Sequence, residues 1–73
     1  ELILVSAGFD AHREDDMGQM GLVESDYTWM TERIVEVADR HAAGRIVSTL
    51  EGGYSLSALG RSVAAHIRAL SKL

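Results

Sequence analysis

Two short apolar segments constrain the fold of this chain more than any other feature of its sequence. Residues 2–5 form a continuous aliphatic run, and residues 46–50 are mostly β-branched. Both patterns are typical of strands, and an uninterrupted apolar run indicates a strand buried on both faces. Between these segments, apolar residues recur every three or four positions, which predicts a crossover helix. A strand, a helix and a strand in this order imply a parallel pair and an α/β fold.

Each expected strand is followed along the chain by an amphipathic pattern. The first helix is expected to begin near Asp26, with Ser25 as its N-cap, and to end at Gly44 in a left-handed conformation. The second is expected to begin near Ser55 or Ser57. The inward stripe of the first helix is expected to consist of Tyr27, Met30, Ile34, Val37, Ala38 and His41. The stripe of the second is expected to consist of Leu56, Leu59, Val63, Ile67 and Leu70.

A βαβα unit of this size can cover one face of its sheet and neither edge. The sequence also begins inside an expected strand and without an initiating methionine. We therefore expect residues 1–73 to be a single partial domain, the C-terminal piece of a larger α/β domain, or else an obligate oligomer. On its own, the chain is expected to form a homo-oligomer through its strand edges or its uncovered sheet face.

Composition excludes several classes of protein. The net charge of −4 argues against a nucleic-acid-binding module, which would carry a basic patch. The absence of cysteine removes a disulfide scaffold, a thiolate zinc finger and a thiol nucleophile. No apolar run approaches the ~20 residues of a membrane helix, and no signal-peptide pattern is present. We accordingly expect a cytoplasmic location, with no direct nucleic-acid partner and no membrane partner.

Candidate site residues follow from the expected parallel sheet, because such folds bind ligands beyond the carboxyl ends of their strands. Asp10 comes after the first strand and Tyr54 after the second, so both are expected at the same edge. The Asp10 carboxylate either binds a divalent cation or caps a turn. Gly52 and Gly53 have three interpretations: a turn with positive φ, a phosphate cradle at a helix N-terminus, or a close wall beside a substrate. In the third, the hydroxyl of Tyr54 is a hydrogen-bond donor.

The three histidines add little to this site. The spacing of Asp10 and His12 is a weak metal-binding signal by itself. His41 and His66 fall within the expected helices, where they are typical of packing or helix-dipole residues rather than of ligands. The sequence contains neither a Ser–His–Asp arrangement nor a glycine-rich nucleotide fingerprint.

Two motifs, LVSAGFDAH at residues 4–12 and LEGGY at residues 50–54, resemble the zinc-dependent histone deacetylase superfamily. Asp15, Met17 and residues 21–22 agree with the same pattern. The superfamily includes bacterial acetoin-utilisation proteins and acetylpolyamine amidohydrolases. The resemblance extends in the right order over nearly all of the chain. It implies an arginase/deacetylase-like parallel-sheet domain, of which residues 1–73 are the C-terminal part.

The resemblance also implies roles for individual residues. Asp10 matches an aspartate ligand of the catalytic zinc, and Tyr54 matches the tyrosine that hydrogen-bonds the substrate carbonyl. Gly52 and Gly53 match glycines that line the acyl-lysine tunnel, and Met17 matches an apolar residue of the tunnel wall. Two positions stand apart from this set. Asp15 matches a loop acid that is usually followed by proline, which is Asp16 here, and His12 matches a position that is not a metal ligand.

The implied reaction is zinc-assisted hydrolysis of the N-acetyl amide of an acyl-lysine or an acetylated amine. The family's other metal ligands, an Asp-x-His pair other than Asp10 and His12, and its catalytic histidine pair have no match in residues 1–73. We therefore expect the chain alone to be inactive and to bind no zinc tightly. The alternative is a non-catalytic α/β oligomerisation or anion-binding module, in which Gly52 and Gly53 hold an anion at a helix N-terminus.

Overall fold

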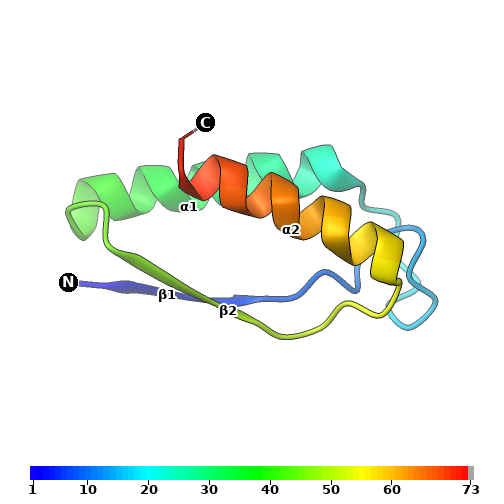
Figure 1. Ribbon diagram of the computed structural model, residues 1–73. Helices are drawn as coiled ribbons and strands as arrows, with labels where there is room; N and C mark the ends of the chain where they lie inside the picture. Colours follow the sequence, from blue (N-terminus) through cyan, green and yellow to red (C-terminus); the bar gives the residue numbers. More distant parts are fainter. Residues whose placement is uncertain (73) are drawn as a thin grey trace.

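The computed structural model describes residues 1–72, which form two strands and two helices in alternation. The elements are β1 (Ile3–Ala7), α1 (Glu24–His41), β2 (Ile46–Leu50) and α2 (Leu56–Leu70), as Figure 1 shows. The two strands pair in parallel, with Ile3 opposite Ile46 and Ala7 opposite Leu50. This arrangement confirms the α/β class and the parallel pair connected by a crossover helix.

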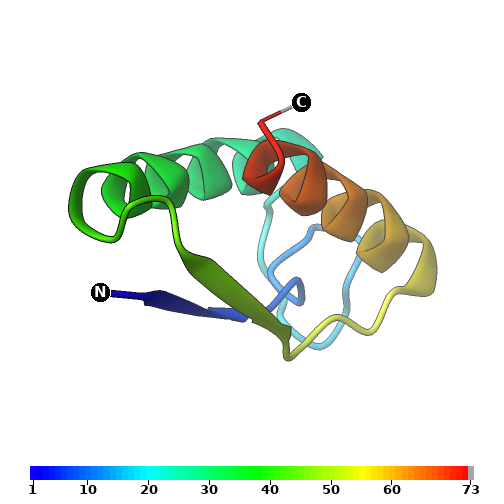
Figure 2. The same cartoon turned by 60° about the vertical axis from the view of Figure 1, so that its left-hand side comes forward.

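Both helices lie on the same face of the strand pair, and Figures 1 and 2 show this from two directions. α1 packs against α2, and neither helix is long and apolar enough to cross a membrane among the residues that the structure describes. On the opposite face, Leu4 and Val47 are partners across the strand pair and are 72% and 49% exposed. One sheet face is therefore covered, as expected, and the other presents apolar side chains to solvent.

The core lies between the C-terminal end of β1 and the start of α1. Ala7, Phe9 and Tyr27 form its buried centre, and the Phe9 and Tyr27 rings pack with centroids 5.1 Å apart. The partly buried side chains that surround this centre are Val5, Leu22, Met30, Leu59 and Val63. Because Phe9 directly precedes Asp10, this core anchors the segment that follows β1.

The ends of α1 differ from the expected ones. Its N-cap is Val23, not Ser25, and the Asp26 carboxylate accepts a hydrogen bond from the Val23 N–H at 2.8 Å. Asp26 thus satisfies a backbone donor from inside the first turn, so an N-cap side chain is not required. At the other end, left-handed backbone begins at Ala43 (φ +51°), one residue before Gly44 (φ +78°).

The inward face of α1 includes a polar residue that the hydropathy pattern omits. Tyr27 and Ala38 are buried as expected, whereas Val37 and His41 are exposed. Thr31 is buried in their place. Its hydroxyl donates to the Tyr27 carbonyl at 2.7 Å, so it can be buried without losing a hydrogen bond.

The expected stripe of α2 was partly wrong. Leu56 and Ile67 are exposed, while the helix buries Ala58, Ser62, His66 and Ala69. The most buried face of α2 is therefore not its most hydrophobic one. Leu59 and Val63 point instead into the core.

Candidate functional site

The carboxyl ends of β1 and β2 meet at one rim of the molecule. Beyond the strands, the Glu51 N–H donates to the Ala7 carbonyl at 2.9 Å, and the Phe9 N–H donates to the Gly52 carbonyl at 2.8 Å. These bonds extend the parallel ladder into both loops. The structure therefore places the segment that contains Asp10 beside the one that leads to Tyr54, as the topology predicted.

Three glycines surround Asp10. A Cβ atom on Gly52 would lie 3.0 Å from Cγ of Asp10, and one on Gly8 would lie 3.3 Å from its Oδ1 atom. On the backbone side, a Cβ atom on Gly18 would lie 1.8 Å from the Asp10 carbonyl oxygen. The close approach at Gly18 leaves no room for a side chain, whereas a Cβ atom at Gly52 would require the Asp10 carboxylate to shift by a few tenths of an ångström. The packing of Gly18 beneath Asp10 had no signal in the sequence beyond the presence of a loop glycine.

Gly53 is required for a different reason from Gly52. Its φ is +143°, and a Cβ atom there would lie 2.6 Å from Cδ1 of Leu59. Gly53 therefore fits the turn interpretation. Gly52 lies close to the Asp10 carboxylate, and its place beside a substrate stays a prediction. Tyr54 follows directly, with 60% of its surface exposed at the rim, and Met17 is also exposed.

Asp15 connects the two rim loops. It is only 2% exposed, and its carboxylate accepts hydrogen bonds from the N–H groups of Met17 (2.9 Å), Tyr54 (2.6 Å) and Ser55 (3.2 Å). The bond from the Tyr54 N–H is the main reason that the pKa of Asp15 is lowered, and burial opposes it. The carboxylate thus lies directly before α2, bonded to the N–H of its N-cap Ser55 and of the preceding Tyr54. The phosphate-cradle interpretation of Gly52 and Gly53 stays a prediction.

A second polar cluster supports the same region from outside. His12 is fully buried; its Nδ1 atom accepts the Glu14 N–H at 3.1 Å, and its Nε2 atom contacts the Glu24 carboxylate. Arg61 of α2 donates to Glu24 at 2.9 Å and also pairs with Glu14. The His12 contact, followed by Arg61, lowers the pKa of Glu24 to about 2. His12 thus joins Glu14 to Glu24 from within the core, and its omission from the metal site stays a prediction.

The described residues fit a metal ion only in part. Asp10 offers carboxylate oxygens at the rim, which suit a zinc ion. Among residues 1–72, however, no group of three histidine, aspartate or glutamate side chains is placed to hold a metal. A catalytic zinc site takes three protein ligands. Asp10 can therefore be one member of a ligand set whose other members come from elsewhere.

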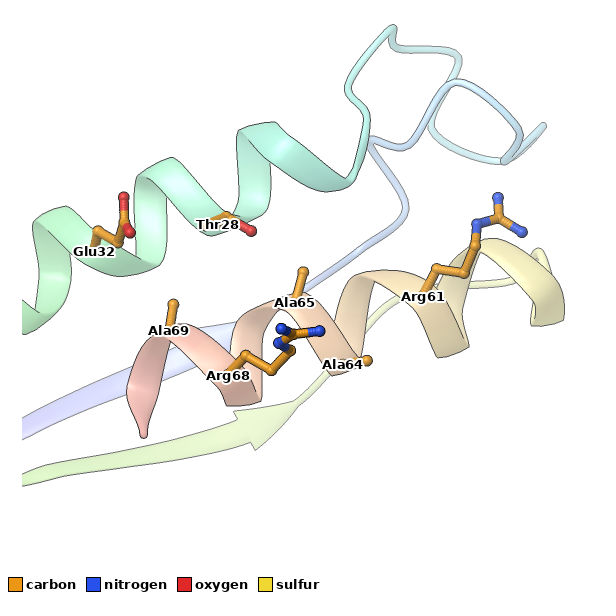
Figure 3. A pocket seen from close by; sticks show the side chains of 7 residues that line it. All are labelled: Thr28, Glu32, Arg61, Ala64, Ala65, Arg68 and Ala69. Atoms are coloured by element: carbon orange, nitrogen blue, oxygen red, sulfur yellow. The ribbon is translucent and has the colours of Figure 1, made fainter. Parts of the chain in front are cut away.

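A groove of about 500 Å³ lies between α1 and α2, away from the rim residues. Figure 3 shows Ala65 and Ala69 of α2 pointing towards Thr28 and Glu32 of α1. Neither Asp10 nor any residue of 52–54 lines this groove. It contains no histidine or buried nucleophile, and we assign the candidate site to the rim.

Comparison with known proteins identifies the class to which this fold and this rim belong. The histone deacetylase domain family matches residues 1–70. Type-2 histone deacetylase 1 of Dictyostelium discoideum is 50% identical over 72 residues, which are 99% of this chain and 5% of that protein. The histone deacetylase-like amidohydrolase of Pseudomonas aeruginosa is 44% identical over 55 residues, covering 75% of this chain and 14% of that protein. The chain belongs to the histone deacetylase family.

A solved structure agrees with this assignment. The crystal structure of the HDA15 HD domain superposes with a TM-score of 0.84 at 33% sequence identity, covering 94% of this chain and 18% of that one. The resemblance seen in the two sequence motifs is thereby confirmed, as is the deacetylase-like fold. The chain spans only a small part of the length of the relatives that it matches.

Proposed function

We propose that residues 1–73 form part of the catalytic domain of a zinc-dependent deacetylase. Asp10 is one ligand of the zinc ion, and Tyr54 donates a hydrogen bond to the substrate carbonyl. The observation that carries this proposal is the close approach of the Asp10 carboxylate to Gly52, where a Cβ atom would lie 3.0 Å from Asp10 Cγ, two residues before Tyr54 at the shared rim of the strands. Membership of the histone deacetylase family supports it.

The proposed substrate is an acetylated lysine or another acetylated amine, whose amide bond is hydrolysed. A bound zinc ion supplies Lewis-acid polarisation of the carbonyl and makes water a nucleophile near neutral pH. The Tyr54 hydroxyl donates to the carbonyl oxygen as negative charge develops on it. Gly52 and Gly53 let the backbone approach the substrate closely, and the exposed Met17 adds an apolar wall.

The isolated chain is proposed to be inactive. Asp10 alone leaves most of the zinc coordination unfilled, because residues 1–72 bring no group of three metal-ligating side chains together. The histidine pair that the resemblance gives as general base and acid has no match in residues 1–73. Stoichiometric zinc on purified residues 1–73, measured by plasma mass spectrometry together with deacetylase turnover, would contradict this proposal. The cytoplasmic location remains a prediction that protein localisation in cells would test.

Tyr54→Phe tests the catalytic role in the complete natural protein. The variant removes one hydrogen-bond donor, so kcat on an acetyl-lysine peptide is expected to fall by roughly 10²–10³-fold. Its zinc content and melting temperature are expected to match those of the wild type, since the ring is largely exposed. An unchanged kcat would reject the role of Tyr54.

Asp10→Asn tests the metal role in the same protein. The neutral amide is a poorer ligand, so the zinc content after dialysis is expected to fall together with the activity. Asp16→Asn, an exposed acid in the same loop, is the control and is expected to retain both. Full zinc occupancy in Asp10→Asn would show that Asp10 does not bind the metal.

A further inference from the structure

The loop that carries Tyr54 is fixed by hydrogen bonds rather than by packing of the tyrosine ring. Residues 51–55 connect β2 to α2 without regular secondary structure, and the Tyr54 side chain is 60% exposed. A phenol that donates to a reacting carbonyl must nevertheless be held within a fraction of an ångström. The backbone of Tyr54 sets the Cα–Cβ direction from which its hydroxyl must reach that carbonyl.

Backbone contacts hold this loop on both sides of Tyr54. Before it, the Gly52 carbonyl accepts the Phe9 N–H at 2.8 Å. After it, the Ser55 carbonyl accepts the Leu59 N–H at 2.7 Å, which starts α2. At Tyr54 itself, the backbone N–H donates to Oδ2 of Asp15 at 2.6 Å, the shortest of the three bonds to this carboxylate.

We propose that Asp15 is a positioning residue that sets the direction of the Tyr54 side chain through the Tyr54 backbone; the proposal rests on the function proposed above for Tyr54. The carboxylate is itself fixed, because its other oxygen accepts the Met17 N–H at 2.9 Å. It is almost fully buried, so solvent competes little for these bonds. One side chain thus joins the loop after β1 to the start of α2.

The charge of Asp15 suits this place in the fold. The Tyr54 and Ser55 N–H groups lie at the start of α2, where the helix dipole and unpaired donors favour a negative group. The first turn of α2 contains no acidic residue of its own. Asp15 therefore supplies from a distant loop the anion that the helix N-terminus lacks locally.

The test compares Asp15→Ala and Asp15→Asn with Asp16→Asn in the complete natural protein. Asp15→Ala removes all the accepted bonds, and kcat is expected to fall by about 10- to 10²-fold, with a smaller change in KM. Asp15→Asn keeps one oxygen acceptor and is expected to restore part of kcat. Zinc content is expected to remain that of the wild type, and Asp16→Asn, which is exposed, is expected to behave as the wild type throughout.

A double variant separates positioning from a general loss of structure. If Asp15 acts through the Tyr54 hydroxyl, Asp15→Asn in a Tyr54→Phe background lowers kcat no further. Hydrogen-exchange mass spectrometry of Asp15→Asn is expected to show faster exchange in the peptide that contains Tyr54 and Ser55, and unchanged exchange in the middle of α2.

Each outcome decides between the two proposals. Additive losses in the double variant, or unchanged exchange around Tyr54 in Asp15→Asn, would overturn the positioning role of Asp15. A Tyr54→Phe protein with wild-type kcat would overturn the proposed function. It would also overturn the effect on kcat that is proposed for the hydrogen bond between Asp15 and the Tyr54 backbone. Faster exchange in that case would still identify Asp15 as the residue that holds this loop.

Discussion

Gly53 and Gly60 illustrate how differently two nearby glycines are constrained. Gly53 has positive φ and lies against Leu59, so a side chain there is both strained and crowded. Gly60 is exposed inside α2, and a Cβ atom would meet nothing within 4 Å. The first glycine is therefore required by the loop, whereas the second only lowers the helix propensity of α2.

We expect opposite effects of alanine at these two positions. Gly53→Ala is expected to lower the free energy of unfolding by more than about 1 kcal/mol, because alanine does not tolerate this φ. Gly60→Ala is expected to raise it by about 0.5–1 kcal/mol, the cost of glycine in a helix interior. Urea unfolding followed by circular dichroism measures the free energy of unfolding of both variants. A change of the same sign in the two variants would contradict the prediction.

Asp10 and Tyr54 could be assigned to one rim from the sequence, because parallel strands end at the same edge. The hydrogen bonds that Asp15 accepts from Tyr54 and Ser55 could not be predicted from the sequence. Asp15 follows Glu14 and precedes Asp16, so its neighbours along the chain indicate a solvated acidic run. The N–H groups that surround it belong to residues 54 and 55, and only folding brings them there.

At the scale of elements, His66 joins both helices and the second strand. The Thr31 hydroxyl already donates to the Tyr27 carbonyl, so His66 Nδ1 must donate to Thr31 at 2.8 Å. The Nε2 atom of the neutral ring then accepts from the Ser48 hydroxyl at 2.8 Å. The ring also packs edge-to-face with the Phe9 ring, at a centroid distance of 5.6 Å. The neutral form of His66 is therefore the one that the fold accommodates.

This burial predicts a pH-dependent stability. Burial lowers the pKa of His66 below its ordinary value of 6.5, so the unfolded chain binds a proton that the folded chain resists. The stability that the neutral His66 contributes to the folded chain is fully present above about pH 6.5, the ordinary pKa of histidine. It is lost as the pH falls from there through the lowered pKa of the folded chain. Urea unfolding between about pH 5 and pH 7.5 should show this decline.

Two variants check the assignment to His66. His66→Gln should flatten the decline, whereas His41→Gln, which alters an exposed histidine at the end of α1, should leave it in place. A decline that persists in His66→Gln and vanishes in His41→Gln would contradict the prediction. The packing role expected for His66 agrees with its burial. The expected apolar stripe of α2 omitted His66, because the stripe was chosen by hydropathy and a histidine can be buried when both ring nitrogens have partners.

At the scale of the whole molecule, both helices cover the same face of the sheet, and no other element of residues 1–72 covers the opposite face. Leu4 and Val47 lie opposite each other on that face and are exposed, as is Leu2 beside them. Both edges of a two-stranded sheet also carry unpaired backbone groups. Apolar surface of this kind favours association with more polypeptide.

We expect residues 1–73 alone to self-associate through this face. Leu4→Lys places a charge in its centre and is expected to shift the population towards monomer in sedimentation velocity runs. Trp29→Gln, which removes an exposed aromatic side chain from α1, is the control and is expected to associate as the wild type does. A wild-type chain that is monomeric at all concentrations would contradict this prediction.

The sequence alone determined the elements, their parallel order, the rim and the family, because each depends on residues close together in the chain or on motifs read in order. Tertiary structure decided which residues are buried in α2, how Asp10 is enclosed by glycines, and what fills the N-terminus of α2. These features depend on contacts between loops far apart in sequence. Such contacts leave no local periodicity, since geometry and not hydropathy selects the residues that make them.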